Sequence, residues 1–96
     1  MKIKSKSGYA CEIDETITED YMFLEAVAQA SDTDHPGKSM IGTVKMVDLL
    51  LGKNKKGFMD AIAKKHDGRV PATVVTDEVM SILTQISSKN SLSSQG

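Results

Sequence analysis

The sequence predicts an α+β fold, in which an N-terminal β-hairpin packs on a bundle of three to four short helices. Over residues 1–14, Gly8 marks a turn between two short segments that read as hairpin strands, and lysines alternate with other residues before it. Downstream, apolar residues recur at helical spacing between short runs of turn-forming residues. We expect one domain over residues 1–87, because 96 residues is a usual length for an independent fold. A flexible tail is expected over residues 88–96, which are rich in serine.

The register of the hairpin over residues 1–14 follows from the position of Gly8. A two-residue loop would mix polar and apolar side chains on each face. A three-residue loop, Lys6-Ser7-Gly8 with Gly8 in the left-handed conformation, pairs Ile3 with Cys11 and separates an apolar face from a charged one. We therefore predict the three-residue loop.

The first two helices are predicted at about residues 19–30 and 39–51. Thr18 precedes two acidic residues, so its hydroxyl is placed to cap the first helix. Residues 31–37 (SDTDHPG) predict a loop, because most are turn formers and the proline opposes a continuing helix. Gly52 is placed to end the second helix as a left-handed cap.

Two further helices are predicted at about residues 55–65 and 74–87. His66-Asp67-Gly68 marks the end of the third helix. Thr73 or Thr76 caps the fourth, whose apolar residues recur at helical spacing. The β-branched run from Thr73 to Thr76 leaves a strand open as an alternative to the first helical turn.

Composition argues against several classes of protein. The formal net charge is −1, with 12 basic and 13 acidic residues, which gives no electrostatic reason to expect nucleic acid or an anionic membrane as partner. The single cysteine forms no internal disulfide. The N-terminus does not resemble a signal peptide, and the longest mid-chain apolar run, 49–51, is far too short to span a membrane. We expect a cytoplasmic protein.

No arrangement of residues in the sequence predicts catalysis, so we expect no enzyme, no metal and no cofactor. His35 lies near Asp32 and Asp34, but the spacing lacks the glycine and the glutamate of a calcium loop, and a solvated loop is the better interpretation. Cys11 falls on the apolar face of the hairpin, where burial raises the pKa of a thiol. It is predicted to be a packed core residue.

Binding is favoured by a methionine-rich centre and by the second helix. Six methionines occur in 96 residues, and flexible thioethers suit surfaces that accept varied apolar partners. The apolar stripe of the helix at 39–51 is wide for so small a domain. We hypothesise that it lines a groove for partner helices or for neighbouring copies in a homo-oligomer. The candidate partner-binding residues are Met40, Val44, Met46, Val47 and Leu51.

Five segments of the chain carry a resemblance to a known family: KIKSKSGYACEID, ITEDYMFLEAVAQA, LLLGKN, HDGRVPATVVTDEVMSIL and KNSLSSQG. Together they resemble tail assembly chaperones of long-tailed phages and prophages of Gram-positive bacteria. The resemblance implies a protein that coats the helical tape-measure protein, recruits tail-tube subunits and leaves before the tail is complete, so that it is not in the finished virion. It also implies a longer, frameshifted form. It carries over no catalytic residue.

The alternative function is a small regulatory module associated with nucleic acid, such as a repressor partner or an antitoxin. The lysines at positions 53, 55, 56, 64 and 65 would then contact phosphates. Such binding falls steeply with salt, whereas apolar binding changes little.

Overall fold

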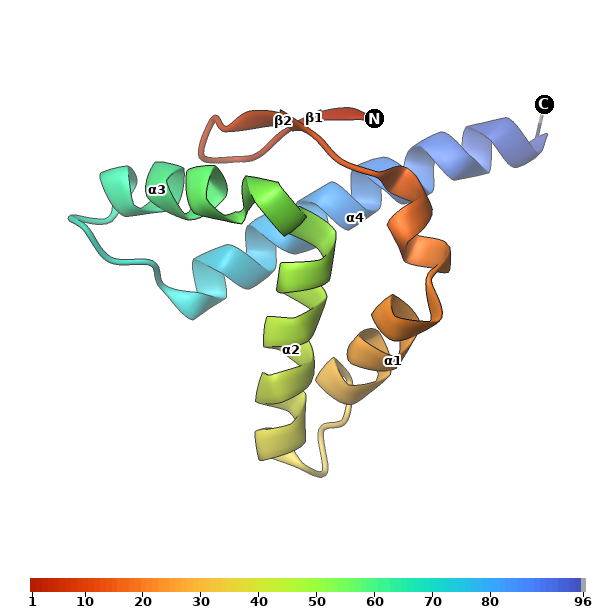
Figure 1. Cartoon of the computed structure of the whole chain (residues 1–96), viewed down its shortest axis with the longest axis horizontal. Helices are drawn as coiled ribbons and strands as arrows, with labels where there is room; N and C mark the ends of the chain where they lie inside the picture. The colour runs from red at the N-terminus through yellow and green to blue at the C-terminus, as the bar shows by residue number, and fades with distance from the viewer. Residues whose placement is uncertain (96) are drawn as a thin grey trace. The chain divides into compact units, whose positions relative to one another are not determined.

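The structure is a computed structural model that describes the backbone of residues 1–95 and the side chains of residues 1–89. An antiparallel hairpin of β1 (Lys2–Lys4) and β2 (Ala10–Glu12) is followed by helices (Figure 1), which confirms the predicted α+β class. The helices are, in chain order, the 3-10 helix η1 (Glu15–Glu19), α1 (Tyr21–Ala30), α2 (Pro36–Leu51), the 3-10 helix η2 (Gly52–Asn54), α3 (Lys55–Lys65) and α4 (Ala72–Gln95).

The chain forms two compact units. Unit 1 contains Met1–Glu12 and the chain from Lys56 onward, and it therefore holds the hairpin with α3 and α4. Unit 2 is Ile13–Lys55 and holds η1, α1, α2 and η2. The prediction of one domain over residues 1–87 stays a prediction.

The hairpin of unit 1 has the predicted register. Ile3 pairs with Cys11, and Lys4 pairs with Ala10. Gly8 has a φ of 91°, the left-handed conformation that the three-residue loop requires. The Ile3 side chain is buried whereas Lys4 is exposed, so the two faces separate as the alternation predicts. β1 packs against α4.

α3 begins and ends at the predicted residues, 55 and 65. Its end is made by Asp67 and Gly68, with φ angles of 58° and 86°. The backbone N–H of Gly68 donates to the carbonyl oxygen of Ala63 at 2.8 Å, which satisfies one of the last carbonyls of the helix. The predicted stop at His66-Asp67-Gly68 is therefore confirmed.

α4 extends beyond the predicted helix at both ends, and with 24 residues it is not one of the short helices that were expected. It begins at Ala72, directly after Pro71, so neither threonine is its cap. The β-branched run is helical, because helical spacing places Val75, Val79 and Ile82 together on a buried face. At the other end α4 continues to Gln95, so residues 88–95 are helical where a tail was expected. The last residue of the predicted tail, 96, lies outside the described residues.

The first helix of unit 2 begins later than predicted. Asp20, not Thr18, is the N-cap of α1, and its carboxylate accepts a hydrogen bond from the backbone N–H of Met22 at 2.8 Å. Thr18 lies inside η1, where its hydroxyl donates to the carbonyl oxygen of Glu15. Asp14 is the N-cap of η1. The chain therefore enters a capped 3-10 helix at this point, and the α-helix starts only after it.

The second helix of unit 2 begins earlier than predicted. Pro36 is the first residue of α2, so the expected start at residue 39 is wrong. A proline at this position needs no N–H partner, and its fixed φ suits a helical first turn. Asp32 orders the loop before it by accepting a hydrogen bond from the backbone N–H of Asp34 at 3.1 Å. Gly52, with a φ of 50°, is the predicted C-cap.

Candidate partner-binding surface

The five predicted partner-binding residues of α2 differ in their exposure: two are on the surface and three are buried. Met40 and Val44 are 71% and 58% exposed. Met46, Val47 and Leu51 are buried, although Val47 and Leu51 continue the same helical stripe. The stripe is thus surface in its N-terminal half and core in its C-terminal half. Of the five predicted residues, only Met40 and Val44 are therefore open to a partner on α2.

Exposed apolar side chains concentrate on the two helices of unit 2. Among residues 1–89, nine large apolar side chains are exposed, and seven of them lie on α1 and α2. Single exposed apolar residues are ordinary in proteins, but their accumulation on one helix pair is typical of an interaction surface. The seven are Tyr21, Met22 and Leu24 on α1 and Met40, Ile41, Val44 and Leu49 on α2.

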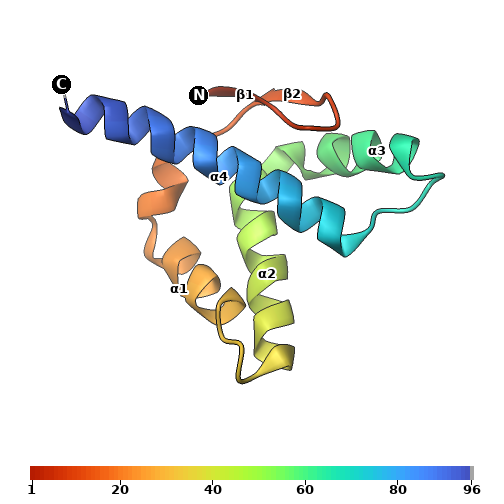
Figure 2. The same ribbon diagram turned by 180° about the vertical axis from the view of Figure 1, so that it is seen from behind.

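α1 and α2 form a helical hairpin that is closely packed near its loop. The two helices meet at residues 31–35 and diverge away from them (Figures 1 and 2). Gly42 allows the close approach, because a Cβ atom there would lie 2.3 Å from the backbone nitrogen of Ala30. The Ser39 hydroxyl donates to the carbonyl oxygen of Ala30 at 2.7 Å, which gives the last carbonyl of α1 a hydrogen-bond partner. The surface residues therefore stand on a well-defined scaffold.

A groove of about 490 Å³ lies between α1 and α2. Glu25, together with Asp32 just after the helix, makes its α1 side acidic. Lys38 and Lys45 make its α2 side basic. Between the charged residues the groove is lined by Ala28, Gln29 and Ile41. The predicted residues Met40 and Val44 do not line this groove, and the sequence did not indicate its charge pattern.

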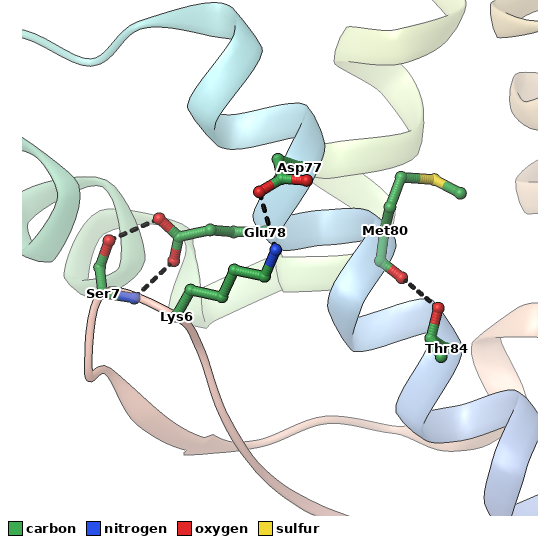
Figure 3. A network of polar contacts seen from close by, with 6 residues as sticks. All are labelled: Lys6, Ser7, Asp77, Glu78, Met80 and Thr84. Carbon is green, nitrogen blue, oxygen red and sulfur yellow. Dashed lines mark hydrogen bonds and ion pairs between the residues drawn. The ribbon is translucent and has the colours of Figure 1, made fainter.

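In unit 1, a network of polar contacts holds the hairpin loop to α4 (Figure 3). The Lys6 ammonium lies 2.8 Å from a carboxylate oxygen of Asp77. Glu78 is only 2% exposed, and its two carboxylate oxygens accept hydrogen bonds from the backbone N–H and the hydroxyl of Ser7. Since a buried carboxylate is costly unless it is hydrogen-bonded, Ser7 is the partner that makes this burial tolerable.

Sequence reasoning missed Glu78, although a signal was present. Glu78 lies next to Val79 and within one turn of Val75 and Ile82, inside the apolar stripe of α4. A charged residue on the core face of a helix indicates a buried polar partner. The structure shows that this partner comes from the hairpin loop, so the network is structural.

Metal and membrane sites are not indicated by the described residues. Within that part of the chain, no group of three or more His, Cys, Asp and Glu side chains lies close enough to hold a metal ion. None of the helices there is both long and apolar enough to cross a lipid bilayer. In the basic region, Lys55 pairs with Asp48 at 2.6 Å and Lys56 with Asp60 at 3.2 Å, which reduces the charge offered to a phosphate.

The thiol of Cys11 is expected to react slowly with alkylating reagents. Cys11 is half-buried, so the prediction of a packed core residue is wrong, but this partial burial raises the pKa of its thiol above the ordinary value because the charged thiolate is less well solvated there. A raised pKa means a smaller thiolate fraction at pH 8. We expect iodoacetamide to modify the folded chain several times more slowly than the same chain in urea. Equal rates in the two states would contradict this prediction.

Comparisons of the chain with protein families, with curated proteins and with solved structures found no match. The resemblance to tail assembly chaperones therefore stays a prediction.

Proposed function

We propose that this protein binds an apolar surface of another protein through α1 and α2, and that it acts as a tail assembly chaperone for a helical tape-measure protein. The proposal is carried by one observation: seven of the nine exposed large apolar side chains within residues 1–89 lie on these two helices. The partner and the role in tail assembly come from the resemblance.

The chemistry of the surface suits transient binding to a helical partner. Met40 and Val44 lie one turn apart on α2, a spacing that matches the apolar stripe of a facing amphipathic helix. Methionine adapts its shape to varied apolar side chains. Full burial of one such side chain contributes about 1.5–3 kcal/mol, so a few of them give reversible binding. A coat that must leave before the tail tube closes requires such reversibility.

Charged substitutions at Met40 and Val44 of α2 are expected to weaken this binding. In Met40→Glu or Val44→Lys, a charge would have to be buried against the partner, and we expect the affinity to fall about tenfold or more. The chain is co-expressed with the products of its neighbouring genes, and we expect the parent chain to capture a long, helix-rich one. Complex formation is then measured by pull-down and by size-exclusion chromatography with light scattering.

Two matched variants separate binding from folding. Met80→Glu alters a methionine of α4 that is 51% exposed, and we expect it to leave both folding and binding unchanged. Met46→Glu places a charge at a buried position and should unfold the chain. Unchanged capture by Met40→Glu and Val44→Lys would overturn the assignment of the surface.

The regulatory alternative predicts a different result. Binding through the lysines at 53, 55, 56, 64 and 65 would shift duplex DNA in a strongly salt-dependent way. A chain that captures no helical partner and shifts DNA at low salt would replace the chaperone proposal with that alternative.

A further inference from the structure

The groove between α1 and α2 carries opposite charges on its two sides, at matched spacing. Glu25 and Asp32 are seven residues apart on the acidic side. Lys38 and Lys45 are also seven residues apart, which is about two turns along α2. Asp32 lies in the loop that joins the helices and Lys38 in the first turn after it, whereas Glu25 and Lys45 lie farther from the loop. Each side of the groove therefore has one charged position near the loop and a second one farther from it.

We propose that this groove binds the same groove of a second copy of the chain, with the two-fold axis running along the groove. Rotation about that axis places α1 of one copy over α2 of the other, at the same height. Glu25 then faces Lys45 of the second copy, and Asp32 faces its Lys38. Because the interface is two-fold symmetric, each of these attractions occurs twice.

The charge pattern selects this arrangement over the other face-to-face pairing. A two-fold axis across the groove would place α1 over α1 and α2 over α2. Carboxylates would then face carboxylates and ammonium groups would face ammonium groups, which disfavours the pairing. A partner with its charges arranged in any other order meets the same repulsion. A second copy supplies the complementary order by symmetry.

The middle of the groove supports the same pairing. Ile41 is exposed, and in the proposed arrangement it packs against Ala28 of the second copy and removes apolar surface from water.

Asp32 remains available as an acceptor although it already has contacts in its own loop. One of its oxygens lies 2.9 Å from Nδ1 of His35, and the other accepts the N–H of Asp34. Each carboxylate oxygen has a second lone pair. Glu25 and Lys45 are exposed helical positions, so their charges are the simplest to exchange without disturbing the loop.

The test is a charge exchange between Glu25 and Lys45. In Glu25→Lys, two lysines face each other twice in the dimer, and in Lys45→Glu two glutamates do. We expect each single variant to dimerise at least tenfold more weakly than the parent chain. An equimolar mixture of the two variants restores both attractions, and so does the double variant E25K/K45E. Association is measured by sedimentation velocity over a concentration series, at low and at high salt.

Two control variants and the salt dependence distinguish the proposed dimer from other forms of association. Lys64→Glu makes the same charge change on α3 and should leave the dimer intact, and Met40→Glu should also dimerise because Met40 does not line the groove. High salt should weaken the parent dimer through screening. A parent chain that is monomeric throughout the series, or single variants whose mixing restores nothing, would overturn the proposal. Circular dichroism of each variant checks that its helices persist.

Discussion

Replacing Phe58 with alanine is expected to lower the free energy of unfolding by about 3–5 kcal/mol. Phe58 is completely buried on α3, and its ring is the largest of the fully buried side chains of the described chain. The substitution removes the apolar contacts of the ring and leaves a cavity that the surroundings fill only in part. Since small domains are stable by about 5–15 kcal/mol, the loss is a large fraction of the total.

The measurement for Phe58→Ala is urea unfolding followed by circular dichroism. Met59→Ala is the matched control, because Met59 is the next residue of the same helix and is only half-buried. We expect a clearly smaller loss for the control. Equal losses at the two positions would show that Phe58 is not a principal core residue.

Gly42→Ala is expected to destabilise the chain by about 1–3 kcal/mol, although alanine is the better helix former. The added Cβ atom would lie 2.3 Å from the backbone nitrogen of Ala30 and 2.6 Å from the Cβ atom of Gln29. The first of these atoms belongs to the backbone and cannot rotate away. α1 and α2 would have to separate, and the hairpin that carries the proposed surfaces would loosen.

Gly37→Ala is the matched control for Gly42→Ala. Gly37 lies in the first turn of the same helix, and a Cβ atom there would meet nothing within 4 Å. We expect this variant to be stabilised by about 0.4–1 kcal/mol, because the unfolded chain loses conformational freedom. Thermal unfolding compares the two variants. An increase in melting temperature for Gly42→Ala would contradict the close packing of the helices.

Local signals predicted the elements that depend on a few neighbouring residues. The register of the hairpin followed from Gly8 and from the alternation that pairs Ile3 with Cys11. The end of α3 followed from the turn residues that come after it. Errors arose where two local signals compete. Thr18 and Asp20 are both good caps, and the sequence pattern does not show that η1 comes between them.

The division of the predicted surface was decided by the tertiary structure. Met40 and Met46 are the same residue type on the same helix, yet one is exposed and the other is buried. Periodicity identifies which residues share a face of a helix, but not where along the helix a neighbouring segment covers that face. The apolar stripe therefore predicted a surface that is only half present.

By itself the sequence determined the fold class, the hairpin register and the existence of the helices, because these depend on spacing and on turn residues within a short stretch of chain. Only the tertiary structure decided that Glu78 is buried against Ser7 and that Gly42 contacts Ala30. It also placed Glu25 and Asp32 across a groove from Lys38 and Lys45. These features join residues that are distant in sequence, and their energies depend on distance and burial, which no local pattern records.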